Sequence, residues 1–262
     1  MYKRLLTLVT LLLLTSVLHA QTTIRITNGE WDPYLSSRAY EYGLTSHMIT
    51  QAFQLEGIDI EWGFFPWKRA FENAKEGREW DAAAAWWPSD DYQDDFFTSN
   101  PIMDTALVFF HLKKYKFDWN SVADLKGINI GLTRGYHYGK ALMDAKFEDK
   151  IYTELANTDE QNFTKLLFER IKIFPNDQTV GYTQIKNTFI LLEADLFTHH
   201  PKKFKVNTLH LLISKKSKQA KYFLAKFNSG LKKLRASPQY QQMLNDLEKG
   251  KYQRQNTRWY KK

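Results

Sequence analysis

Two hydrophobic periods alternate along the first half of the chain. Residues 24–28 alternate between apolar and polar side chains, and residues 58–64 and 81–86 form two more short apolar runs, as is typical of β-strands. Between them, residues 44–56 carry apolar side chains at helical spacing, and a second helical segment runs from Pro66 to Gly77. This order of strand, helix, strand, helix and strand predicts an open parallel sheet with right-handed crossovers.

The same order begins again in the second half. Strands are predicted at 128–133 and 171–174, and helices at 160–170, 179–190, 217–236 and 238–249. Two further strands, 107–113 and 208–214, are the natural connections if one α/β unit is inserted into the other. We therefore predict an α/β protein whose two lobes are joined by a two-strand hinge and enclose a cleft. Lobe I would comprise residues 21–111 and 207–262, and lobe II residues 112–206.

The N-terminus has the pattern of a secretory signal peptide. Lys3 and Arg4 precede an apolar run from Leu5 to Leu18, and the small residue Ala20 precedes polar residues. A membrane anchor is the alternative, but a spanning helix needs roughly 20 apolar residues and this run is shorter. We expect residues 1–20 to be removed, with cleavage near Ala20-Gln21, and the protein to reside in the periplasm.

Composition narrows the chemistry further. The chain has no cysteine, which excludes disulfides, thiolate metal sites and a lipidated cysteine after the signal. Its net charge of +8 falls to +6 if Lys3 and Arg4 leave with the signal. Residues 249–262 contain six basic residues and no acid, and in a periplasmic protein we expect this end to be solvated rather than bound to nucleic acid. We expect a monomer.

Candidate binding residues lie where the predicted strands end. In open parallel sheets, ligands bind beyond the carboxyl ends of the strands. Aromatic faces, two carboxylates and a guanidinium meet there, a mixture suited to a small ring-bearing or cationic polar ligand. The alternative is that some of these tryptophans belong to the core. Of Trp86 and Trp87, one should face the core and the other the cleft, because neighbours on a strand face opposite ways. The candidates are Glu30, Trp31, Tyr34, Trp67, Trp86, Arg134, Tyr136 and Asp177.

Arg134 is supported by a separate argument. It lies in Thr-Arg-Gly-Tyr (133–136), where a predicted strand turns into the start of a helix. Free backbone N–H groups at such a turn attract an anionic group, and a guanidinium adds a bidentate contact. The alternative is an arginine solvated on a loop.

Motifs of catalysis and metal binding are missing from the sequence. It has no Gly-x-Ser-x-Gly, no His-Glu-x-x-His, no glycine-rich phosphate loop and no cysteine nucleophile. The acidic residues at 90–95 lack the glycine and the distal glutamate of an EF-hand loop, so a solvated helix N-terminus is favoured over a calcium site. His199 and His200 are adjacent, and their side chains should diverge on an extended backbone. We expect a binding protein rather than an enzyme, without cofactor or metal.

Seven short motifs together resemble the bacterial extracellular solute-binding proteins of the polar-amino-acid class (family 3), which serve ABC importers. Their order and spacing carry the likeness over nearly the whole chain after the signal. The resemblance implies a type II periplasmic-binding fold, ligand capture by lobe closure and an ABC permease of the inner membrane as partner. The motifs lie at residues 28–34, 65–70, 80–82, 99–102, 124–127, 131–136 and 209–215.

One position departs from that family. Its amino-acid binders usually carry an arginine about seven residues before the serine of a Ser-Asp-Pro motif, and this arginine grips the ligand carboxylate. Here the position is Tyr92, which argues against an ordinary α-amino acid as ligand. Arg134 or Arg69 could substitute, although Arg69 could equally brace the lobe from its helix. The family's second-lobe acid, which often binds a ligand amine, matches Asp177.

Two other functions on the same fold stay open, because a fold does not determine its function. One is a catalytic relative, such as a periplasmic dehydratase acting on a ring acid. The other is a sensory partner that transmits its ligand state to a membrane receptor.

Overall fold

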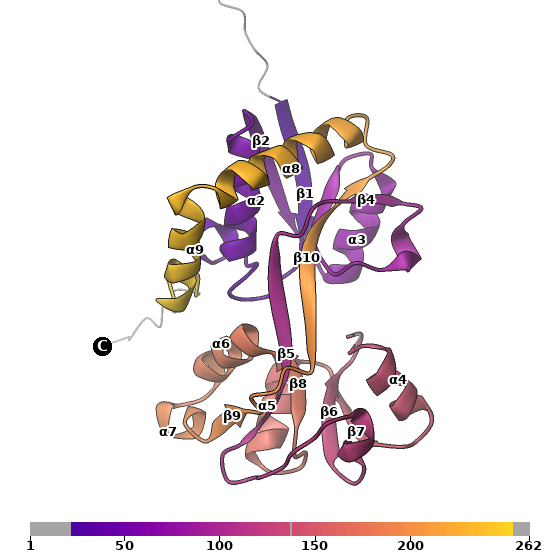
Figure 1. Ribbon diagram of the computed structural model, residues 1–262, viewed down its shortest axis with the longest axis vertical. Helices are drawn as coiled ribbons and strands as arrows, with labels where there is room; N and C mark the ends of the chain where they lie inside the picture. Colours follow the sequence, from indigo (N-terminus) through magenta and orange to yellow (C-terminus); the bar gives the residue numbers. More distant parts are fainter. Residues whose placement is uncertain (1–21, 137, 254–262) are drawn as a thin grey trace, which may run out of the picture.

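Two α/β lobes lie one above the other, and two long strands run between them (Figure 1). The computed structural model describes residues 22–136 and 138–253, so the predicted signal peptide lies outside the described residues. Both chain ends of the described part belong to the upper lobe (Figure 1). Within the described ranges no helix is long and apolar enough to cross a membrane.

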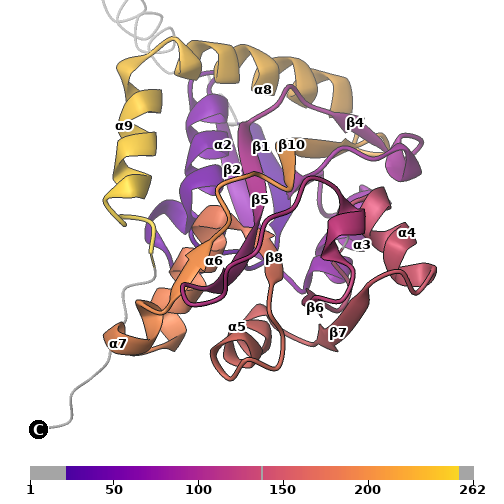
Figure 2. The same cartoon turned by 60° about the horizontal axis from the view of Figure 1, so that its bottom comes forward.

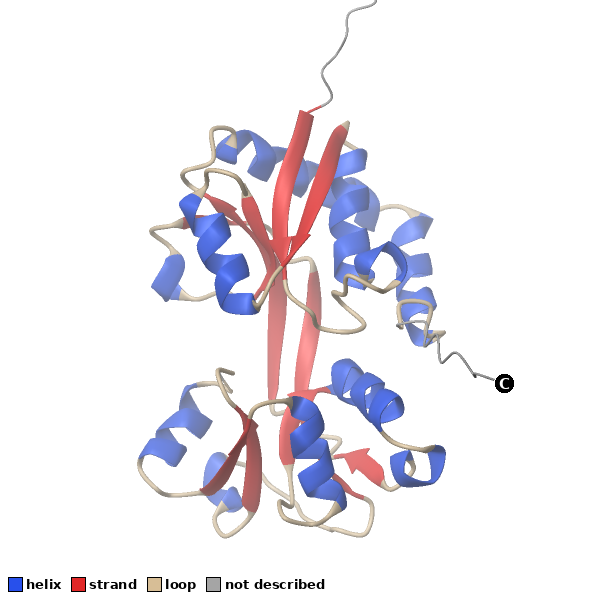
Figure 3. Cartoon of the chain, turned by 180° about the vertical axis from the view of Figure 1, so that it is seen from behind, coloured by secondary structure: helices blue, strands red, loops and turns tan. Residues whose placement is uncertain are grey.

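Lobe I is built on a sheet with helices on its faces (Figure 3). Strands β1, β2 and β3 are parallel, and β10 runs antiparallel to β3 and β4. The strands are β1 (Thr22–Asn28), β2 (Ile58–Phe64), β3 (Ala82–Trp86), β4 (Phe96–Thr98) and β10 (Lys205–Ser214). The helices are α2 (Leu44–Gln54), α3 (Trp67–Glu76), α8 (Ala220–Arg235) and α9 (Pro238–Glu248), with short 3-10 turns η1 (Tyr40–Tyr42) and η2 (Asp90–Tyr92).

Lobe II combines antiparallel and parallel pairs. Strand β5 is antiparallel to β8 and β9, whereas β6 and β7 form a parallel pair that a bridge between Ile130 and Ile173 joins to the rest. The strands are β5 (Met103–Leu112), β6 (Asn129–Thr133), β7 (Tyr152–Ala156), β8 (Phe174–Asp177) and β9 (Phe197–His199). The helices are η3 (Val122–Leu125), α4 (Lys140–Phe147), α5 (Asp159–Leu167), α6 (Gln178–Thr188) and α7 (Leu191–Ala194).

The connection between the lobes is β5 paired with β10, but not over the predicted residues. Residues 103–107 pair with 205–209, whereas 107–112 pair with β8 and β9 of lobe II. The predicted crossing at 107–113 and 208–214 is therefore displaced, and residues 107–112 lie beyond the crossing. The prediction placed the crossing at the most hydrophobic residues of β5, 107–112. These residues are buried in the sheet of lobe II and do not form the connection between the lobes.

The strand predicted at 171–174 lies instead at β8, Phe174–Asp177, and contains Pro175. Proline cannot donate a backbone hydrogen bond, so a proline usually argues against a strand. Here Pro175 lies within a four-residue strand that pairs with β5 on one side and is bridged to β6 on the other. The shift makes Asp177 the last residue of the strand.

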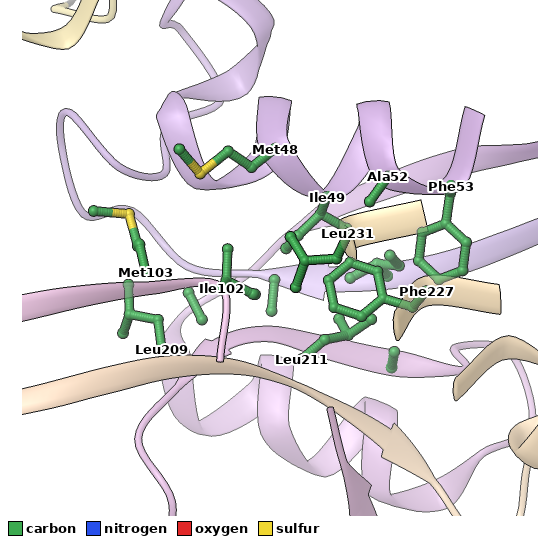
Figure 4. Close-up of a cluster of buried hydrophobic side chains, with 14 of the residues drawn as sticks. Met48, Ile49, Ala52, Phe53, Ile102, Met103, Leu209, Leu211, Phe227 and Leu231 are labelled. Carbon is green, nitrogen blue, oxygen red and sulfur yellow. The ribbon is translucent and has the colours of Figure 1, made fainter. Parts of the chain in front are cut away.

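The core of lobe I lies between the sheet and the helices α2 and α8 (Figures 2 and 4). Phe53 of α2 and Phe227 of α8 are fully buried, with ring centroids 5.2 Å apart. The two helices approach closely at Gly230, where an added Cβ would lie 1.8 Å from the carbonyl oxygen of Ala52. This packing fixes the sheet whose strand ends face lobe II.

Candidate functional site

Asp177 is a buried carboxylate at the junction of the lobes. It ends β8 and caps α6, accepting hydrogen bonds from the backbone N–H of Thr179 (2.9 Å) and Val180 (3.0 Å). The backbone N–H of Ala106, in the connecting part of β5, donates to its other oxygen at 3.3 Å. The residue is 1% exposed. Burial raises the pKa of its carboxyl to about 6, and the hydrogen bonds oppose that rise.

Tyr34 of lobe I contacts this carboxylate directly. Its hydroxyl donates to Asp177 Oδ1 at 3.2 Å. Burial, together with the nearby charge of Asp177, raises the pKa of Tyr34 well above its ordinary value, so the phenol stays protonated. Val180 of α6 also packs in the core of lobe I. The lobes therefore touch along this edge, and a polar contact between them ends on Asp177.

Aromatic rings extend from that contact through Tyr34. Trp31 meets Tyr34 edge-on at 5.1 Å and Trp87 at 6.3 Å between ring centroids. Trp87 packs against core residues of both lobes, and Lys205 Nζ lies 5.6 Å from its ring centroid. The indole Nε1 of Trp87 is buried and has no hydrogen-bond partner among the described residues. Three rings and a buried carboxylate thus form one group, which we call the junction group: Trp31, Tyr34, Trp87 and Asp177.

Trp87 was missing from the predicted set, which contained Trp86. The ring of Trp86 packs instead against Trp67 (5.5 Å) and Phe71 (4.9 Å), within the aromatic side of lobe I. The pleat of β3 separates the two tryptophans, as their adjacency predicts, but sequence does not say which one turns toward lobe II. The position of Trp87 could have identified it, because it lies just beyond the end of β3, where ligand-binding residues are expected.

Tyr92, the position where the resembled family carries arginine, belongs to the same aromatic side. Its hydroxyl donates to the carbonyl oxygen of Trp87, and its ring lies 5.5 Å from that of Phe71. Burial raises the pKa of Tyr92 to about 12, which keeps it a donor at neutral pH. This side chain therefore braces the segment that presents Trp87.

Other predicted residues of lobe I lie outside the junction group. Glu30 is exposed and accepts hydrogen bonds from the backbone N–H (3.0 Å) and hydroxyl (2.5 Å) of Ser37. Trp67 lies against Gly29, where an added Cβ would be 2.4 Å from its ring. Arg69 is exposed on α3. Their roles in binding stay predictions.

In lobe II, Arg134 and Tyr136 belong to a different polar cluster. Arg134 Nε donates to Asn157 Oδ1 at 3.3 Å, and the hydroxyl of Tyr136 lies 3.5 Å from Asp159 Oδ2. Asp159 is 3% exposed, and Thr133 and Gln184 donate to its two oxygens. Burial raises the pKa of Asp159. No described contact joins Arg134 to the junction group.

The residues considered for metal binding are engaged elsewhere. Asp95 pairs with Lys75 at 2.8 Å, and Ser89 caps the 3-10 turn η2. His199 contacts Tyr182, whereas His200 contacts Asp118. Within residues 22–136 and 138–253, no three His, Cys, Asp or Glu side chains are grouped so as to hold a metal ion.

Comparison with known proteins places the fold. No protein-family model matches this sequence, and no curated protein matches it either. Solved structures do match. An ancestral arginine-binding protein bound to arginine superposes with a TM-score of 0.70 at 14% identity, over 87% of this chain and 99% of that one. A histidine kinase sensor domain with similarity to periplasmic binding proteins also gives 0.70, at 15% identity over 87% and 96%.

A third match is an ancestral amino-acid-binding protein, a precursor of cyclohexadienyl dehydratase, with a TM-score of 0.64 at 15% identity over 86% of this chain and 94% of that one. The chain has the periplasmic-binding-protein fold, which confirms the predicted fold class. Proteins of this fold include amino-acid binders and a sensor domain, and one is a dehydratase precursor. The fold alone does not choose among them.

Proposed function

We propose that this protein is a periplasmic solute-binding protein that captures a small, amine-bearing polar ligand between its lobes and delivers it to an ABC permease. The carboxylate of Asp177 carries the proposal. It is 1% exposed, lies where the lobes meet, and has no ion-pair partner among the described residues. A buried carboxylate without a cation is costly, and a ligand ammonium group would satisfy it.

The junction group supplies the rest of the binding energy. The hydroxyl of Tyr34 reaches Asp177, and Trp31 packs edge-on against Tyr34; aromatic rings near a carboxylate suit a cationic ligand. The buried Nε1 of Trp87 can donate to an acceptor on the ligand. We propose that closure occurs by bending of the paired segments 103–107 and 205–209, with affinity set by the difference between open and closed states.

The first test is thermal unfolding of the mature protein with a panel of basic amino acids, polyamines, neutral amino acids and organic acids. A ligand at about 100 times its Kd adds roughly 2.7 kcal/mol of stability. For a chain of this size the midpoint should rise by about 5–10 °C. We expect amine-bearing compounds to give the largest rise. A rise confined to acids without an amine would contradict the proposed ligand class.

A variant then assigns the site. Asp177→Asn removes the charge and should weaken binding of the amine ligand about 100-fold in calorimetry, because a charged partner is lost from a buried pair. Asp195→Asn, at an exposed position, makes the same charge change as a matched control and should bind as the parent does. Equal affinities of parent and Asp177→Asn would exclude the junction group as the site.

The other two functions are tested in the same samples. Their support is the likeness of the fold to a dehydratase precursor and to a kinase sensor domain. A product released from a bound ring acid, detected by mass spectrometry, would establish catalysis. Tight ligand binding without stimulation of the cognate permease would favour the sensory function.

A further inference from the structure

Lobe II has a pocket that is separate from the junction group. It lies between the end of β7 and helix α5 and has a volume of about 360 Å³. All of its lining residues come from lobe II, and Arg134 is the one shared with the predicted ligand set. The polar lining is Arg134, Asn157, Gln161, Thr164, Lys165 and Arg170.

The charges around this pocket are unbalanced. Three cations line it, and only Lys165 has a carboxylate partner, Glu154 at 3.1 Å. Arg134 and Arg170 form no ion pair with any residue of the described ranges. The pocket therefore carries an excess of about two positive charges, the feature that recruits an anion.

The pocket is also held in shape by hydrogen bonds. Arg134 N–H donates to the carbonyl oxygen of Ala156 at 2.8 Å, which fixes the ends of β6 and β7 side by side. Asn157 then accepts from Arg134 Nε at 3.3 Å, leaving the outer nitrogens of the guanidinium for another acceptor. Lys165, 16% exposed in its side chain, is oriented by a 3.2 Å bond to the carbonyl oxygen of Leu155.

We propose that this pocket binds a doubly charged oxyanion of the phosphate class. Two guanidinium groups match phosphate oxygens in bidentate geometry, and an ammonium adds a third charged donor. A volume of about 360 Å³ exceeds that of bare phosphate and fits a small phosphate ester. Two sources supply this chemistry: a free phosphate ester and the phosphomonoester headgroup of an anionic lipid. The site is independent of the ligand bound at the junction group.

Calorimetry at low salt tests the proposal with glycerol 3-phosphate as probe. Arg170→Gln should weaken binding by about fivefold or more, the loss of one charge-assisted contact. Glu154→Gln should act in the opposite direction, tightening binding by about threefold, since it frees Lys165 and removes a negative charge. Arg78→Gln, which deletes an exposed positive charge in lobe I, is the matched control and should have no effect.

A second experiment distinguishes the two sources of the phosphate. Sedimentation with vesicles containing phosphatidic acid, a phosphomonoester lipid, that depends on Arg170 would identify a lipid headgroup, whereas binding of glycerol 3-phosphate alone would identify a free ester. Equal losses in Arg170→Gln and Arg78→Gln would overturn the proposal, because net charge would then explain binding. Absence of both kinds of binding, or a Glu154→Gln variant that does not bind more tightly, would overturn it as well.

Discussion

Replacing Asp177 by asparagine should make the protein more stable while removing its proposed ligand contact. The carboxyl has its pKa raised from 3.8 to about 6, so folding disfavours the ionised form. A rise of this size corresponds to about 3 kcal/mol in favour of the neutral side chain at pH 7. Asparagine is neutral and close in shape, so it should recover part of that free energy.

The hydrogen bonds limit the gain. Oδ1 accepts from Tyr34, Thr179 and Val180, and an asparagine Oδ1 can keep all three. The other oxygen accepts from Ala106 N–H at 3.3 Å, and an amide nitrogen there would face a donor. Losing that bond costs about 1 kcal/mol. We therefore expect a net stabilisation of about 1–2 kcal/mol, or a midpoint rise of roughly 2–8 °C.

The stability difference between Asp177→Asn and the parent should depend on pH in a definite direction. Asp177 has a raised folded-state pKa, so the folded protein binds more protons than the unfolded chain between pH 4 and 6. The free energy of unfolding contributed by this group therefore falls as pH rises through that window, and is lowest above pH 6. The advantage of Asp177→Asn should be full at pH 7, shrink below pH 6 and be lost near pH 4.

Chemical denaturation of parent and variant at several pH values between 4 and 7.5 measures this difference. Taking the difference removes the contributions of other titrating groups. Asp195→Asn, whose side chain is exposed, should show no comparable gain. An Asp177→Asn protein that is less stable than the parent at pH 7, or a difference that does not change with pH, would refute the reasoning.

Two further substitutions test the packing and charges of lobe I. Gly230→Ala should destabilise the protein by about 3 kcal/mol, because the new Cβ would meet the carbonyl oxygen of Ala52 at 1.8 Å, and Lys232→Ala on the exposed side of α8 should not. Denaturant midpoints would measure both. Glu56→Gln should cost about 1 kcal/mol at pH 7, since hydrogen bonds from Lys233, Ser229 and Lys226 lower the pKa of Glu56 to about 2. That stabilisation is present above pH 4.5 and is lost as pH falls toward 2, so the variant's deficit should vanish in acid.

Periodicity predicted the elements of lobe I closely. The helix predicted at 44–56 is α2, Leu44–Gln54, and the strand predicted at 58–64 is β2. Glycine marked the helix end at Gly77, where φ is +62°. These elements form strong local patterns because each buries one face. The short strands β4, β7 and β9 escaped prediction. Strands β4 and β9 have three residues each, too few to establish a period, and β7 fully buries only Ala156, so it shows no apolar face.

The candidate site was predictable as a region but not as a set of contacts. The rule that ligands lie beyond strand ends gave Trp31, Tyr34 and Asp177, and the structure brings these three together. The same rule gave Arg134, which follows β6 yet turns toward Asn157 and α5. The end of a strand fixes the position of the backbone, whereas the conformation of the following loop fixes the direction of a long side chain. That conformation depends on the packing of the folded lobe, which the sequence pattern does not give.

Under the proposed function, the contacts of Asp177 connect the ligand site to the paired segments between the lobes. Ala106 belongs to the segment where β5 pairs with β10, and its backbone N–H donates to Asp177 Oδ2 at 3.3 Å. Tyr34 approaches the same carboxylate from lobe I. A cation at Asp177 would change the charge felt by both contacts at once, one in the hinge and one across the lobes. Because a ligand shifts a conformational equilibrium only through contacts that differ between states, we propose that this shared carboxylate couples ligand binding to closure.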